Sequence, residues 1–307
     1  MFRLKDLVLI GMAVTGILGG VFMPKLAGFF TPAVLYLMMT LLFLAFLNVD
    51  YFSLLQLDRK DLQEVVLWTV LKLLVLPVGL WGIARLLAPD YALPVLVLSG
   101  VSTGVTAPFF ATHLGANINR VLKLVMFTSL LVPFTLPFLV SWLMDGEMKI
   151  SAVDMSLMLL KVIFIPLGAA LLVKKTMPGV IIHFNRIAFP LSLTIFLLIN
   201  LGIFSRYSEF LKAHQDQLAA SVGVACLCAL AYVLIAMLVA LLSKWRMDGL
   251  TGAVSLLYVN NVLAVVFGGQ FFGPKTPLLA AVYMLPVFLM VLPMRMLSGL
   301  NLETQAK

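Results

Sequence analysis

The residues that could do chemistry are few, and the prominent ones lie inside long apolar runs. Lys72 stands about ten residues into an apolar segment that begins near residue 62. A hydroxyl-rich stretch runs from Ser99 to Thr106, and Asn260 and Asn261 stand side by side in another apolar segment. Charged and amide side chains are costly in a lipid-spanning helix, so they are usually retained where they line a polar path or bind a ligand. These residues are therefore the first candidates for a functional site.

Composition indicates that these residues are carried by membrane-spanning helices. The chain of 307 residues is 63% hydrophobic and 11% charged, and its mean hydropathy is +1.12. A soluble domain is about half apolar and a quarter charged, so a soluble class is excluded. The formal charge of +8 comes from Lys and Arg that stand between apolar segments, where they set orientation. We therefore expect a lipid bilayer as partner and no nucleic acid.

The apolar segments predict ten transmembrane helices. The first follows Met1 to Asp6 directly and continues to Met23 without a small-residue cleavage site, so we interpret it as a helix and not as a signal peptide. The predicted helices lie near 6–23, 29–48, 62–87, 92–113, 120–142, 152–173, 187–204, 216–243, 249–270 and 276–299.

The spacing of these helices predicts two repeats. Helices three, four and five recur as helices eight, nine and ten at an offset of about 155 residues. We therefore expect a first five-helix repeat at 1–146 and a second at 147–307, in one integrated transmembrane domain. Five is an odd number, so the second repeat enters the membrane from the opposite side, as in inverted-repeat transporters. Lys and Arg are more numerous in the loops on the side of the termini, which predicts cytoplasmic termini and an inner or plasma membrane location.

Two of the predicted helices are interrupted. Pro108 with the nearby Gly104 predicts a break near 104–108, and the asparagine pair predicts a second break near 258–261. Paired half-helix N-termini at these breaks would favour an anion through free amides and helix dipoles. The alternative is that Pro108 only kinks its helix and that the asparagines only bond between helices. On the first interpretation the substrate-binding candidates are Lys72, Ser102, Thr103, Thr106, Tyr258, Asn260 and Asn261.

Lys72 is the most informative charge. It lies about 15 Å into its helix, where a lysine costs about 2.5–3.5 kcal/mol on insertion scales. We interpret it as a fixed positive charge for an anion or as a proton carrier, the alternative being a lysine that snorkels to the interface. Lys161 is a second central lysine, and one hypothesis is that it faces the cavity from across. Arg120 and Lys123 are expected to be interfacial anchors.

These motifs resemble those of the bile acid:sodium symporter family, within a superfamily that includes auxin efflux carriers. The likeness is clearest at Gly104-Val105-Thr106-Ala107 through Leu114, at Ser129 to Pro137, and at Asn260-x-x-Leu263-Ala264 followed by Gly273-Pro274. The resemblance implies that helices one, two, six and seven form a panel domain. It also implies that helices three to five and eight to ten form a core domain in which helices four and nine cross.

The chain departs from this family at the expected sodium ligands. By the resemblance, the glutamate and glutamine of helix nine fall on Ser255 and Val259, and the helix-three glutamine falls on Lys72. The remaining ligand positions fall on Pro108, Phe109, Leu122 and Met126. In the chain itself, no Asp or Glu stands in the middle of a predicted helix. Sodium and proton sites usually need hard oxygen ligands or a titrating carboxylate, so the usual sodium sites are expected to be missing.

Together these features predict a secondary active transporter that carries a small organic anion by alternating access. The class of carboxylate stays open between bile-acid, keto-acid and pantoate-like. The alternatives are a sodium-coupled symporter with a backbone-based site, an auxin-efflux-like carrier, and a channel-like or sensory membrane protein. We expect no enzyme, because no paired acids or metal-ligand set stand in the helices. No cofactor or metal is expected, Cys226 and Cys228 are interpreted as packing residues, and a monomer and a weak homodimer are both open.

Overall fold

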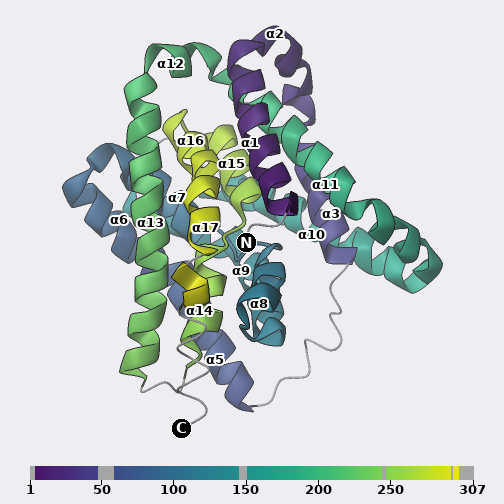
Figure 1. Ribbon diagram of the computed structural model, residues 1–307, viewed down its shortest axis with the longest axis vertical. Coiled ribbons are helices and arrows are strands. Elements are labelled where there is room, and N and C mark those ends of the chain that lie inside the picture. The colour runs from purple at the N-terminus through teal and green to yellow at the C-terminus, as the bar shows by residue number, and fades with distance from the viewer. Residues whose placement is uncertain (1–3, 48–58, 145–150, 244–246, 292, 297–307) are drawn as a thin grey trace.

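Helices account for all of the regular structure in the part of the chain that the structure describes, apart from one isolated bridge (Figure 1). The structure is a computed structural model, and it describes residues 4–47, 59–144, 151–243, 247–291 and 293–296. The all-helical class predicted from the sequence is thereby confirmed. The predicted termini and the loops around residues 48–58, 145–150 and 244–246 lie outside the described residues.

The first half of the chain contains most of the short elements, which are distorted or interrupted pieces of longer helices. Its elements are α1 (Leu4–Phe22), α2 (Pro24–Ala27), η1 (Gly28–Ala33), α3 (Val34–Leu47), α5 (Arg59–Val70), η2 (Leu71–Val75, a π-helix), α6 (Leu76–Leu87), η3 (Pro89–Tyr91), α7 (Ala92–Gly100), α8 (Ala107–Leu114) and α9 (Ile118–Leu143).

The second half contains three long helices followed by shorter ones. Its elements are α10 (Ala152–Thr176), α11 (Pro178–Arg206), α12 (Ser208–Ala213), α13 (Gln215–Leu242), α14 (Gly249–Leu257), α15 (Asn261–Phe271), α16 (Lys275–Val282) and α17 (Met284–Leu289).

Five helical stretches of the described residues are long and apolar enough to cross a membrane. They are Pro24–Leu47, Asp61–Leu87, Ile118–Leu143, Ala152–Thr176 and Gln215–Leu242. A span needs about 20 apolar residues to cover the hydrocarbon core. Three shorter apolar helices, Pro190–Arg206, Asn261–Phe271 and Lys275–Leu289, accompany them. These lengths support a multi-pass membrane protein.

Differences between the observed and the predicted bounds include the following three. The helix predicted at 187–204 already begins at Pro178, because proline is well suited to the first turn of a helix. The short helix α12 connects α11 to α13 and was not predicted. The single helix predicted at 276–299 is divided at Tyr283 into α16 and α17. Pro286 follows in the first turn of α17, where its missing N–H breaks the hydrogen-bond ladder.

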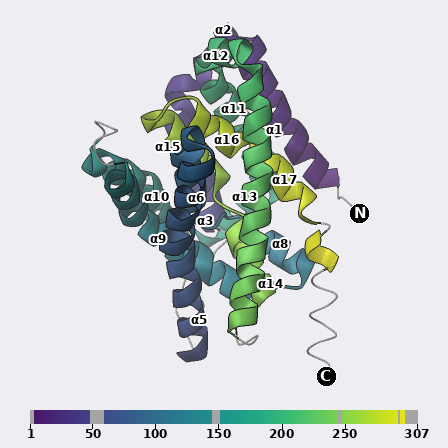
Figure 2. The ribbon, with the colours of Figure 1, turned by 90° about the vertical axis from the view of Figure 1, so that its left-hand side faces the viewer.

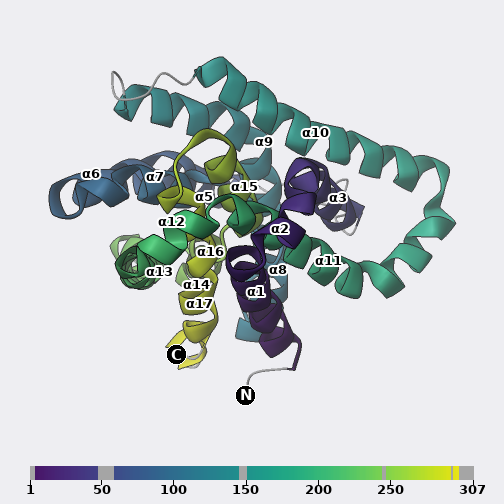
Figure 3. The ribbon, with the colours of Figure 1, turned by 90° about the horizontal axis from the view of Figure 1, so that it is seen from above.

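Close packing between α1 and α11 depends on glycine. A Cβ atom on Gly16 or Gly20 would lie 2.7 Å from a Cβ atom of α11, so only glycine allows the two helix backbones to approach this closely. Helix α11 also packs against α3, which in turn packs against α10. Figure 3 shows these four helices on one side of the molecule.

The other helices pack around α13. This long helix contacts α14 and α16, while α7 contacts α6 and α16. Figure 2 shows α5 and α6 following one another as a single long rod. The interrupted helices α7–α8 and α14–α15 therefore lie in the interior, between the rod, α13 and α9.

Candidate functional site

The two interrupted helices meet at their breaks. Helix α7 ends at Gly100 and α8 begins at Ala107, while α14 ends at Leu257 and α15 begins at Asn261. The first break is therefore 101–106, earlier than the predicted 104–108. Pro108 does not cause the break from inside a helix; it occupies the first turn of α8, where its missing N–H costs nothing.

Backbone groups of one break that lack a partner within a helix form hydrogen bonds with backbone groups of the other break. The Gly104 amide donates to the Tyr258 carbonyl at 2.7 Å, and the Asn260 amide donates to the Ser102 carbonyl at 2.8 Å. Thr103 pairs with Val259 in the only β-bridge of the described residues. Unpaired backbone groups inside a membrane cost several kcal/mol each, so non-helical backbone is tolerated only where such partners exist. The crossing is therefore one structural unit.

Thr103 fixes this unit to its neighbours. Its amide donates to Thr128 Oγ1 of α9 at 3.0 Å, and its hydroxyl donates to the Ser255 carbonyl of α14 at 3.0 Å. Ser255 itself keeps a buried hydroxyl oxygen without a partner among the described residues. The crossing is thus held from α9 on one side and from α14 on the other.

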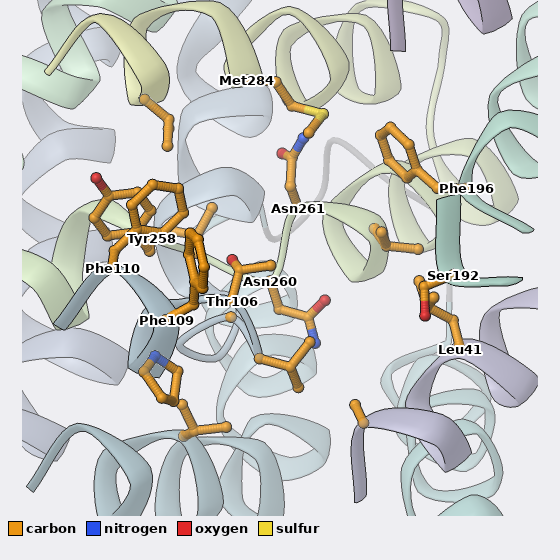
Figure 4. A pocket seen from close by; sticks show the side chains of 18 of the residues that line it. Leu41, Thr106, Phe109, Phe110, Ser192, Phe196, Tyr258, Asn260, Asn261 and Met284 are labelled. Atoms are coloured by element: carbon orange, nitrogen blue, oxygen red, sulfur yellow. The ribbon is translucent and has the colours of Figure 1, made fainter. Parts of the chain in front are cut away.

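A cavity of about 580 Å³ lies beside the crossing (Figure 4). Its walls come from both breaks, α8, the first turns of α9, the second half of α3, the middle of α11 and the turn between α16 and α17. The lining is mostly apolar, and no lining residue among those described carries a formal charge. A concave, largely apolar pocket with a few polar groups is typical of a small-molecule site.

The asparagine pair contributes two different groups to this cavity. Asn260 is buried and caps α15, because its Oδ1 accepts from the Leu263 amide at 3.2 Å. Its Nδ2 lies 3.4 Å from Ser102 Oγ. The Oδ1 and Nδ2 atoms of Asn261 are buried and have no partner among the described residues. Asn260 is therefore a structural cap, whereas the side-chain amide of Asn261 is unpaired among the described residues.

Aromatic rings form one wall of the cavity. The rings of Phe110 and Tyr258 are stacked with centroids 3.8 Å apart and planes at 11°. Phe109 is 40% exposed, and Figure 4 shows it next to this pair. Exposed aromatic surface in a cavity favours a ligand with a flat or apolar body.

Lys72 lies behind the crossing and not in the cavity. It belongs to the π-helix η2, and its ammonium donates to the Ser99 carbonyl in the last turn of α7 at 2.9 Å. The side chain is only 1% exposed, and the ammonium lies 5.5 Å from the centre of the Tyr232 ring. Among the described residues, no carboxylate is paired with it. The ammonium therefore meets the negative end of the α7 dipole.

The structure brings together only part of the predicted set. Thr106, Tyr258, Asn260 and Asn261 line the cavity, whereas Lys72, Ser102 and Thr103 are buried outside its lining. Lys161, for which a position facing the cavity was one hypothesis, is exposed on α10 and does not line the cavity.

Two cavity residues of α11 were missed. Ser192 and Phe196 face the crossing from the opposite wall (Figure 4). A lone serine and a phenylalanine in an apolar helix carry no sequence signal that separates them from packing residues.

The half-helix N-termini differ from the prediction. At the start of α8 the amides of Ala107, Phe109 and Phe110 all bond to carbonyls of the preceding loop, and Pro108 has no N–H. At the start of α15 the Val262 amide has no acceptor among the described residues. The amides of Val105 and Thr106, directly before α8, also have no acceptor among the described residues, and both residues line the cavity.

Arg120 and Lys123 are ion-paired and not simple interfacial anchors. Arg120 contacts Asp61 at 3.0 Å and Glu64 at 2.8 Å, and Lys123 contacts Asp61 at 3.1 Å. Lys123 is only 5% exposed. Glu64 also accepts from the Asp248 amide at 2.9 Å. The prediction missed this because it considered each charge alone, although α5 and α9 bring the opposite charges together.

Capping extends this polar cluster to the crossing helices. Asp248 caps α14 by accepting from the amides of Leu250 and Thr251, and Thr251 Oγ1 accepts from the Asn117 amide at 3.0 Å. Asn117 caps α9, because its Oδ1 accepts from the Arg120 amide at 3.1 Å. The first turns of α5, α9 and α14 are thereby held together.

Replacement of Glu64 by glutamine should destabilise the protein by about 1.5–3 kcal/mol, because a buried hydrogen bond to a charged group is lost. Asp90→Asn is the matched control, because the Asp90–Lys275 pair at 2.7 Å is exposed and should contribute little. Thermal unfolding of the purified protein in detergent measures both. Equal stability of the two variants would show that the Arg120–Glu64 pair contributes nothing.

At the end of the molecule near α12, residues at and just after the end of α11 contact α15. The Tyr207 hydroxyl donates to the Gly269 carbonyl at 3.2 Å, and Arg206 Nη1 donates to the same carbonyl at 3.4 Å. Nearby, the Lys275 ammonium beside Asp90 holds the pKa of that carboxyl below its usual range. The cavity lies away from these contacts. It is lined by the second half of α3 and by the first turns of α9, which follow the α8–α9 turn.

These features define a polytopic helical membrane protein with an interrupted-helix crossing beside a small-molecule cavity. Residues 32–214, more than half of the chain, match the sodium bile acid symporter family. The chain therefore belongs to the sodium bile acid symporter family, and membership places it among membrane transporters. The matched range contains the first break and ends before the second. A comparison with curated proteins found no match.

Proposed function

We propose that the protein is a secondary active transporter that carries a small organic anion by alternating access, without the sodium sites expected for its family. The observation that carries this proposal is the position of Lys72. Its ammonium occupies the buried space below the crossing and bonds to Ser99 O at the end of α7. A fixed positive charge here supplies what a bound cation would supply, and it repels a second cation.

The neighbouring groups support the same interpretation. At the positions where the family resemblance implies sodium ligands, Ser255 offers one hydroxyl oxygen and Val259 offers no side-chain oxygen. The Ser102 carbonyl, which would be a backbone ligand, already accepts from Asn260. A sodium ion needs several hard oxygens at once, and this donor set does not fit it.

The closed end and the cavity support alternating access. Arg206 and Tyr207 close the side near α12 against α15, while the cavity lies toward the α8–α9 turn. We propose that α1–α3, α10 and α11 form the panel domain and that the helices around α13 form the core domain. On this proposal 1–146 and 147–307 are inverted repeats, and the contacts of Arg206 and Tyr207 break when the cavity changes sides.

Orientation can be tested with two exposed residues. Both termini are proposed to be cytoplasmic, which places Glu209 of α12 outside and Asn119 at the start of α9 inside. In a background without Cys226 and Cys228, Glu209→Cys should react with an impermeant thiol reagent added to sealed cells, whereas Asn119→Cys should react only after permeabilisation. The reverse pattern would invert the proposed topology.

The function itself is tested by a ligand screen followed by transport. Purified protein is screened by thermal shift against organic acids with and without sodium, because a ligand that binds the folded state raises apparent stability. The acid with the largest shift is then used for counterflow in proteoliposomes. Counterflow of the labelled acid is expected of a carrier. Flux without counterflow would assign the fold to a channel, and no binding by any acid would overturn the anion proposal.

A further inference from the structure

The two backbone bonds that join the breaks correspond to one another through a constant shift in residue number. The Gly104 amide donates to the Tyr258 carbonyl, and the Asn260 amide donates to the Ser102 carbonyl. The numbers 102 and 258 differ by 156, and so do 104 and 260, so the shift converts each bond into the other. The crossing is therefore two-fold in its backbone bonding, and each break needs a support of its own.

Thr128 of α9 supports the first break. Its Oγ1 accepts from the Thr103 amide at 3.0 Å, and its own hydroxyl proton goes to the Leu124 carbonyl at 2.6 Å. Thr103 and Thr128 are both buried. Because the bond to Leu124 fixes the hydroxyl, a lone pair of Thr128 is aimed at the break. Without this acceptor the Thr103 amide would be unpaired inside the membrane, which is strongly unfavourable.

Tyr283 supports the second break. Its hydroxyl donates to the Leu257 carbonyl at 2.8 Å, and both residues are fully buried. Leu257 is the last residue of α14, where carbonyls lack partners within the helix. The same carbonyl accepts from the Val259 amide at 3.0 Å. Tyr283 therefore fixes the atom on which the turn of the second break closes, and it also lines the cavity.

Thr128 and Tyr283 stand at corresponding places in the two halves of the chain. Their residue numbers differ by 155, one less than the shift of 156 that relates the breaks. Helix α9 begins at Ile118 and α16 begins at Lys275, which is a shift of 157. Each half thus uses a hydroxyl from the helix that follows its interrupted helix. This hydroxyl is an acceptor for the first break and a donor for the second.

From this correspondence we propose that Thr128 and Tyr283 are equivalent positioning residues, one in each half, and that they make α9 and the α16–α17 helix move together with the crossing. The inference rests on the proposed function, because alternating access is the movement in which the crossing has to be carried as one body. The two hydroxyls place the cavity groups that the breaks carry, among them Thr106 and Asn261. Since backbone bonds join the breaks, loss of either support should loosen both.

Hydrogen–deuterium exchange of the purified protein in detergent, without any ligand, tests the proposal. Tyr283→Phe and Thr128→Val each remove one hydroxyl at nearly constant side-chain shape. In either variant, amide exchange in both breaks, 101–106 and 258–260, should become faster by about tenfold or more, because one buried hydrogen bond is lost. Exchange in α1 and α10 should stay unchanged.

Three control variants make this result specific. Thr128→Ser keeps the hydroxyl and should exchange like the wild type. Tyr36→Phe removes an exposed hydroxyl of α3. Thr135→Val removes a hydroxyl of α9 that bonds to Leu131 O within its own helix. Neither of the last two should change exchange in the breaks.

The possible outcomes separate this inference from the proposed function. Unchanged exchange in the breaks of Tyr283→Phe or of Thr128→Val would overturn the positioning role, and so would exchange that becomes equally fast along the whole chain. Faster exchange in one break alone would overturn the joint movement. Because the measurement needs no transport, a protein that carries no organic acid would overturn the proposed function and leave this test intact. Thr128→Ala provides a second variant in case the valine variant does not fold.

Discussion

Lys72→Met should strongly reduce transport while leaving the protein at least as stable as the wild type. The buried ammonium has one hydrogen-bond acceptor, Ser99 O, and no paired carboxylate among the described residues. A buried charge without an ionic partner is costly, so replacing it by an apolar side chain of similar length should be neutral or stabilising. Loss of the positive charge behind the crossing should nevertheless reduce uptake by about tenfold or more. The measurements are uptake into proteoliposomes and the melting temperature in detergent.

Three further variants make this result specific. Lys161→Met removes an exposed lysine of α10 and should leave uptake unchanged. Lys72→Arg keeps the positive charge, but its planar guanidinium differs in shape from the compact ammonium. Transport by Lys72→Arg should therefore be impaired less than transport by Lys72→Met. Lys72→Gln should lose activity without gaining sodium dependence. Normal uptake by Lys72→Met would make Lys72 a tolerated structural lysine and would remove the basis of the proposed coupling.

Gly104→Ala should have the second large effect, on both stability and transport. A Cβ atom at Gly104 would lie 2.5 Å from the Val259 carbonyl oxygen, and this oxygen belongs to backbone that cannot rotate away. The two breaks must then separate, which weakens the bond from the Gly104 amide to Tyr258 O. Overpacking of this kind costs about 1–3 kcal/mol. A lower melting temperature and the loss of counterflow are expected together.

Gly79→Ala is the matched control for this substitution. Gly79 lies in α6, and a Cβ atom there would meet nothing within 4 Å. Alanine in an open helical position usually stabilises by about 0.4–1 kcal/mol, so the two glycine variants should change the melting temperature in opposite directions. If Gly104→Ala unfolds at the wild-type temperature and transports normally, the close contact of the two breaks is not required.

The sequence predicted the parts of the fold that depend on local pattern. Long apolar runs with proline or polar residues at their ends identified most helices, since a span requires length and hydrophobicity that no other element shows. The second break was located correctly because two adjacent asparagines are rare in an apolar helix. The first break was placed too late, because Pro108 was interpreted as the cause of the break and not as the start of α8.

The site could be predicted only as a set of candidates. Thr106 and Asn261 do line the cavity, but the depth and rotation of each helix decide which candidates reach it, and these depend on packing between distant segments. Lys72 was identified from its cost in the membrane, yet its bond to Ser99 O depends on the π-helix η2, for which the sequence has no clear signal. The ion pairs of Arg120 and Lys123 likewise required knowledge that α5 lies beside α9.

Sodium dependence of uptake tests the central claim most directly. Proteoliposomes are loaded with the carboxylate that stabilises the protein best, and uptake of the labelled acid is measured with sodium and with potassium as the external cation. Because Lys72 occupies the buried space behind the crossing, the account predicts equal initial rates in the two media. Uptake that requires sodium would contradict it and would show that a cation binds at the crossing in spite of the buried ammonium.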